Sequence, residues 1–60
     1  MMTEANESAI NWAMVAYAAE CARAGMLVLD IRDNVVSKFG LTREQAMKEL
    51  TRTQSMWLAP

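Results

Sequence analysis

Hydrophobic residues recur along residues 9–24 at spacings of three and four, which is typical of an α-helix. On a helical wheel they fall on two opposite faces. One face carries Ile10, Met14, Tyr17 and Cys21, and the other carries Trp12, Val15 and Ala19. A surface helix of a monomeric protein needs only one apolar stripe. This pattern therefore predicts a helix over about 6–24 that acts as a central hub and packs on both sides.

The second segment ends at a glycine, as the first does. Gly25 and Gly40 follow the two apolar segments, and glycine is the commonest residue just past the end of a helix. Helical periodicity predicts a helix over about 27–39, with one apolar face made by Val28, Ile31, Val35 and Phe39. The strand-forming residues in 26–29 leave a second reading open, in which the helix begins only at Asp30 and the preceding residues are extended.

The third segment has the clearest start signal in the chain. Thr42 is followed three residues later by Gln45, the spacing of a capping box, in which each side chain bonds to the other residue's backbone amide. The preceding Leu41 is placed for a hydrophobic staple. We predict a third helix over about 42–57.

These elements define an all-α fold of three short helices, about 6–24, 27–39 and 42–57, in one domain spanning 1–60. We expect residues 1–5 and 58–60 to fray, and the first helix to be capped near Thr3–Asn6. A chain of 60 residues is marginally stable by itself. With a single cysteine and no histidine, neither an intrachain disulfide nor a zinc site can stabilise it, which leaves oligomerisation. We therefore predict an intertwined or side-by-side homodimer whose core and interface use Ile10, Trp12, Met14, Val15, Tyr17 and Cys21.

Charge and composition indicate which partners and which cellular compartment to expect. The net charge is −1, so the chain has no bulk attraction to nucleic acid, although residues 31–60 carry a small basic excess. The acidic, polar start MMTEANES is unlike a secretory signal, and no apolar run reaches the length of a membrane span. Together with the lone cysteine, these features indicate a cytoplasmic protein without a membrane partner.

One local sequence pattern resembles a known functional motif. The stretch Val35–Ala46, VVSKFGLTREQA, resembles the turn of helix-turn-helix DNA-binding proteins, in which a short helix ends at a glycine and a capped recognition helix follows. The resemblance implies that Arg43, Glu44, Gln45 and Lys48 face the major groove and that Lys38 or Arg52 contacts phosphate. The sequence departs from the family pattern at three positions, Val36, Ala46 and Glu49.

The residues offer no catalytic set, since a nucleophilic cysteine has no histidine partner here. We expect a non-enzymatic protein without a metal, a cofactor or a small-molecule substrate. Two functions remain open. The first is a regulatory or inhibitory module that binds a macromolecule, a protein above all, through helix surfaces on the exposed side of the 30–57 hairpin. The alternative is a small helix-turn-helix transcriptional regulator using the same hairpin. Under either, the candidate contact residues are Lys38, Arg43, Gln45, Lys48, Arg52 and Trp57.

Overall fold

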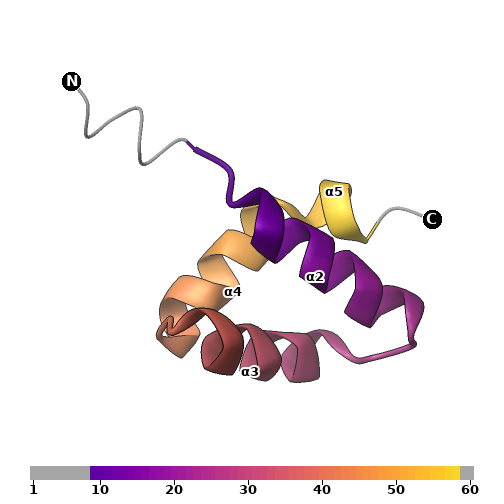
Figure 1. Ribbon diagram of the computed structural model, residues 1–60, viewed down its shortest axis with the longest axis horizontal. Helices are drawn as coiled ribbons and strands as arrows, with labels where there is room; N and C mark the ends of the chain where they lie inside the picture. Colours follow the sequence, from indigo (N-terminus) through magenta and orange to yellow (C-terminus); the bar gives the residue numbers. More distant parts are fainter. Residues whose placement is uncertain (1–8, 59–60) are drawn as a thin grey trace.

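The computed structural model describes residues 9–58, and this part of the chain is all-helical (Figure 1). Its helices are α2 (Trp12–Arg23), α3 (Val28–Phe39), α4 (Arg43–Arg52) and α5 (Gln54–Trp57). The predicted all-α class is confirmed over these residues, which contain no strand. No helix among them has the length and apolar character needed to cross a bilayer.

The first helix begins later than predicted. Asn11 is its N-cap, with its Oδ1 accepting a hydrogen bond from the Met14 amide at 3.1 Å. Asparagine is among the best N-cap residues because its side chain satisfies an amide that has no partner inside the helix. Residues 9–11 therefore lie outside α2, and the predicted start near residue 6 is wrong in this part. The predicted cap at Thr3–Asn6 lies outside the described residues.

The start and end of α3 agree with the sequence pattern. The helix begins at Val28, one residue after the predicted start, so the alternative start at Asp30 is excluded. It ends at Gly40, which adopts the left-handed conformation with φ of 69°. The Gly40 and Leu41 amides both donate to the Val36 carbonyl, at 3.0 and 3.3 Å. A residue with a Cβ is strained in this conformation, which explains the glycine.

The predicted capping box is present at the start of α4. The Gln45 amide donates to Thr42 Oγ1 at 3.0 Å, and the Thr42 amide donates to Gln45 Oε1 at 3.2 Å. A short, well-defined turn thus joins α3 to α4.

The predicted single helix over 42–57 is wrong, because the chain breaks at Thr53 into α4 and α5. Thr53 is fully buried, and its hydroxyl donates to the Glu49 carbonyl at 2.7 Å. The Trp57 indole N–H donates to the Leu50 carbonyl at 2.9 Å. The Glu49 carbonyl also accepts from the Thr53 backbone amide, at 3.1 Å, whereas the Leu50 carbonyl is bonded by the Trp57 side chain, in the last turn of α4 where helix carbonyls lack helical backbone donors. The redirected chain brings Trp57 into the core.

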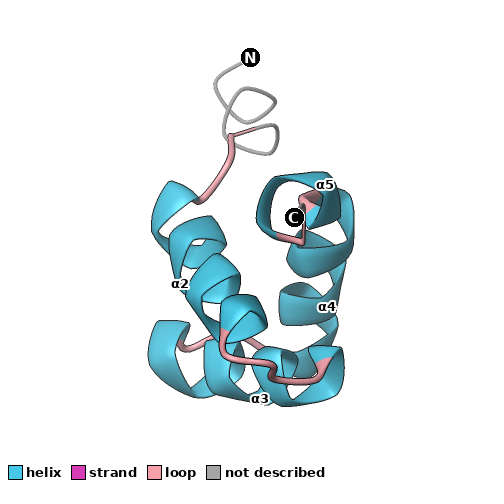
Figure 2. Ribbon diagram, turned by 90° about the vertical axis from the view of Figure 1, so that its right-hand side faces the viewer, coloured by secondary structure: helices cyan, strands magenta, loops and turns pink. Residues whose placement is uncertain are grey.

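The helices enclose one small core. In Figure 2, α3 lies across the bottom, with α2 on one side and α4 and α5 on the other. α2 packs against α3 and α5, and α3 packs against α4. The buried hydrophobic residues are Met14, Val15, Ala18, Cys21, Ile31, Val35, Ala46, Leu50 and Trp57.

Candidate interaction surfaces

The residues predicted for a core or dimer interface divide into three groups. Met14, Val15 and Cys21 are buried inside the chain, so they are core residues. Ile10 and Tyr17 are half-buried at the edge of this core. Trp12 is 63% exposed, which is unusual for the largest side chain of a small protein. Val15, predicted on the same face as Trp12, is buried, so the chain covers more of α2 than that division of faces predicted and leaves Trp12 exposed.

Tyr17 joins α2 to the C-terminal end of α3. Its ring meets that of Phe39 edge-on, with centroids 6.1 Å apart, and Lys38 Nζ lies 5.1 Å from the Tyr17 ring centroid. Loss of solvent on burial, together with a hydrogen bond to the Cys21 side chain, raises the pKa of the Tyr17 phenol. Lys38 is exposed, and its ammonium group lies over the Tyr17 ring, whose face attracts this positive charge.

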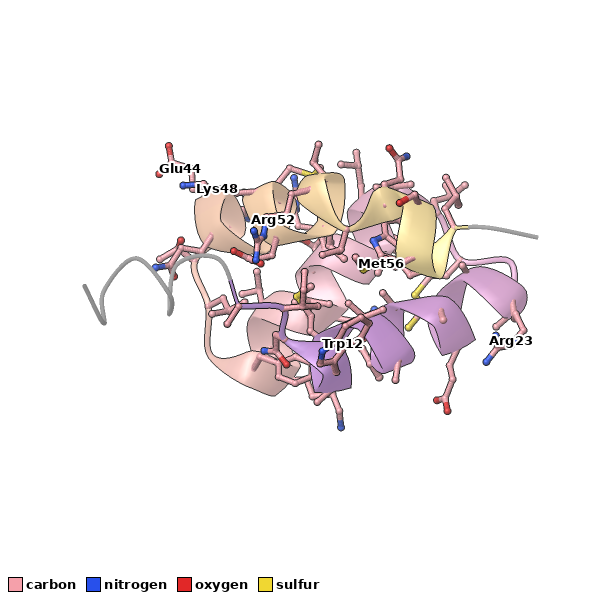
Figure 3. All side chains as sticks on the ribbon, turned by 90° about the horizontal axis from the view of Figure 1, so that it is seen from above. Trp12, Arg23, Glu44, Lys48, Arg52 and Met56 are labelled. Carbon is pink, nitrogen blue, oxygen red and sulfur yellow. The ribbon has the colours of Figure 1, made fainter. Side chains whose placement is uncertain are left out.

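The polar face of α4 carries charges of both signs. Arg43 and Lys48 are exposed, and Figure 3 shows Lys48 beside Glu44 at the start of the helix. Gln45 is also exposed, but its side-chain oxygen is engaged in the capping box. Glu44 stands one helical turn before Lys48, and a carboxylate at that spacing lowers the positive potential of this face toward phosphate.

Arg52 connects the end of α4 to the start of α2. Its Nε donates to Glu49 Oε1 at 3.0 Å, and its Nη2 donates to the Ala9 carbonyl at 2.6 Å. The contact with Ala9 joins positions that are 43 residues apart in the sequence, and the contact with Glu49 lies within α4. Arg52 thus takes part in a tertiary contact, a role that sequence reasoning did not assign to it.

A shallow groove of about 530 Å³ lies between the start of α2 and α4. Its lining mixes apolar, amide and charged side chains: Ala9, Asn11, Met14, Leu41, Gln45, Lys48, Glu49 and Arg52. Within residues 9–58, no group of three or more acidic, cysteine or histidine side chains is arranged to hold a metal ion.

Trp57, predicted as a contact residue, lies in the core at 3% exposure. Within residues 9–58, the large apolar side chains that are exposed form two sets. The first, at the corner where the chain enters α3, consists of Leu27, Val28 and Leu29, and we call it the α3 entry patch. The second consists of Trp12 on α2, Met56 on α5 and Leu58 just after α5. Figure 3 shows Trp12 and Met56 on the same face of the molecule.

The α3 entry patch was missed by the sequence analysis because periodicity assigned Val28 to a buried face. One signal was present. Leu27 occupies the N-cap of α3, where its side chain makes no capping hydrogen bond, and it is 72% exposed. Leucine is among the poorest residues at an N-cap. Leu27 thus contributes neither a capping bond nor a buried side chain to the fold.

Comparison with known protein families, with curated proteins and with solved structures gives no match to this chain.

Proposed function

We propose that this chain is a small, non-enzymatic regulatory or inhibitory protein of the cytoplasm that binds a protein partner through the α3 entry patch. The observation that carries the proposal is the exposure of Leu27 and Leu29, at 72% and 56%, on the first turn of a helix. Contiguous apolar side chains bordered by polar ones are typical of protein interaction sites. Asp30 and Asp33, on the same helix, provide such a border.

The position of this patch gives it a defined shape. Leu27 has an extended backbone, with φ of −73° and ψ of 154°, and Leu29 lies in the helix that follows. Helix α3 is anchored by the buried side chains of Ile31 and Val35. The patch is therefore held in one conformation, so a partner would not have to order it on binding.

The alternative is a helix-turn-helix DNA-binding regulator. The tight turn between α3 and α4 supports it, as do the exposed side chains of Arg43 and Lys48. Against it, Arg32 pairs with Asp33 at 2.9 Å and Arg52 with Glu49 at 3.0 Å, so two cations of the hairpin are already neutralised. A nucleic-acid surface needs a basic cluster, and the protein-binding proposal is favoured for this reason.

The variant Leu27→Ser separates binding from folding. Serine is a preferred N-cap and stands three residues before Asp30, so the fold should gain about 0.5–1 kcal/mol in stability. The same change removes the most exposed side chain of the patch, and capture of the partner from native cell extract should fall at least tenfold. Arg43→Ala is the matched control and should retain the partner.

DNA binding is tested in parallel with a labelled mixed-sequence duplex. Affinity that falls steeply between 50 and 200 mM salt, as is typical of phosphate contacts, and that weakens further in Arg43→Ala, would establish the alternative. Equal capture of the same protein by Leu27→Ser and the native chain would refute the proposed surface.

A further inference from the structure

The uncovered side of α2 carries a regular seam. Trp12, Ala16, Ala19 and Arg23 follow one another at spacings of four, three and four residues, which keeps them on one face of a helix. Trp12, Ala16 and Arg23 are exposed and Ala19 is half-buried at the edge of the face. This is the α2 seam. It has an aromatic side chain at one end, a cation at the other and two methyl groups between them.

The α2 seam is complementary to a second copy of itself that runs in the opposite direction. If two copies of α2 cross antiparallel with a two-fold axis between residues 17 and 18, Trp12 meets Arg23 of the partner copy and Ala16 meets Ala19 of the partner copy. Each contact then occurs twice, which is the property that a two-fold symmetric interface requires. Figure 3 shows Trp12 and Arg23 near opposite ends of α2, as this register needs.

The chemistry of each contact is favourable. A guanidinium over an indole ring is the strongest of the common cation–π pairs. Two alanines at the crossing allow the helix axes to approach closely, because the side chains at the contact set the interaxial distance. Parallel pairing of the seam would instead place Arg23 against Arg23 of the partner copy, and like charges in contact are unfavourable. Charge therefore selects the antiparallel direction.

We infer that the α2 seam is the dimerisation surface of this protein, and that its occupant is a second copy of the chain in antiparallel register. Met56 on the neighbouring α5, and Leu58 just after it, are further exposed apolar side chains, and Figure 3 shows Met56 on the same face as Trp12. The core of the chain is small, and two alanines and a cysteine are among its buried residues. A chain with so small a core is marginally stable alone and would be stabilised by a second copy. The inference does not depend on the proposed function, since the α3 entry patch lies elsewhere.

Sedimentation equilibrium over about 1 µM to 1 mM tests the association. The native chain should pass from monomer to dimer, and the emission of exposed Trp12 should shift to the blue over the same range while buried Trp57 changes little. Ala16→Glu places a carboxylate at each side of the crossing and should weaken the dimer at least thirtyfold. Ser37→Glu adds the same charge at an exposed position of α3 and should change the dissociation constant by less than about twofold.

Arg23→Glu tests the end contacts and should weaken the dimer about tenfold, because it removes both cation–π pairs. Both variants change exposed positions, and their helical circular dichroism at low concentration should equal that of the native chain. Leu27→Ser should leave the dimer intact, so that failure of the partner-binding proposal and failure of the dimer proposal give different results.

Cross-linking tests the direction in a Cys21→Ala background. A mixture of the Ala13→Cys and Glu20→Cys variants should form disulfide-linked heterodimers, because these positions lie within about one helical turn across an antiparallel crossing. Ala24→Cys alone should not cross-link to itself. A native chain that stays monomeric to 1 mM, a dimer unaffected by Ala16→Glu, or self-cross-linking of Ala24→Cys would each overturn the inference.

Discussion

Replacement of Trp57 tests the account of how the C-terminal part of the chain completes the core. The indole is 3% exposed, and its N–H donates to the Leu50 carbonyl at 2.9 Å in the last turn of α4. Trp57→Phe keeps an aromatic ring in the core but removes the donor. The Leu50 carbonyl would then be left without that hydrogen bond in a site that excludes water.

The magnitude follows from the cost of an unsatisfied buried group. Loss of one partner of a buried hydrogen bond costs about 1–3 kcal/mol, and the smaller ring adds to this. A chain of 60 residues has a total stability of about 3–9 kcal/mol. Trp57→Phe should therefore lose about 2 kcal/mol. Trp57→Ala should lose about 3–5 kcal/mol and leave much of the chain unfolded.

Urea unfolding followed by circular dichroism measures the effect. With a slope of about 1 kcal/mol per molar urea, the midpoint of Trp57→Phe should fall by about 2 M. The chain supplies its own control in Trp12→Phe, at a position that is 63% exposed, whose midpoint should move by less than about 0.5 M at concentrations where the protein is monomeric. Equal midpoints for Trp57→Phe and Trp12→Phe would refute the role given to the indole.

Two further predictions concern local contacts. Thr42→Ala removes the acceptor for the Gln45 amide and should cost about 1 kcal/mol in urea unfolding, whereas Thr51→Ala, at an exposed position inside α4, should cost little. The raised pKa of Tyr17 means that the folded state holds the phenolic proton more tightly than the unfolded chain. This contribution to stability is present below about pH 10 and is lost as the pH rises through the folded pKa, so unfolding midpoints measured from pH 8 to 11 should fall less steeply in Tyr17→Phe.

The helix ends that the sequence predicted are those set by local chemistry. Gly40 and the Thr42–Gln45 pair interact only with residues a few positions away, so the local sequence is enough to predict these helix ends. The predicted start of α2 was wrong because the sequence offers several good N-cap residues near the N-terminus. Hydrophobic periodicity does not indicate that Asn11 is the one used. The break at Thr53 depends on the Trp57 indole reaching the Leu50 carbonyl, seven residues back, which no propensity describes.

The two tryptophans show why the interaction surfaces were harder to predict than the fold. A helical wheel reports which residues share a face, but it does not report which faces the rest of the chain can cover. α5 has only four residues, and it packs against α2 while Trp12 remains 63% exposed. Trp57, predicted as a contact residue, instead lies in the core. The tryptophan on the short final helix is thus the one that is buried, and the tryptophan on α2 is the one that remains exposed.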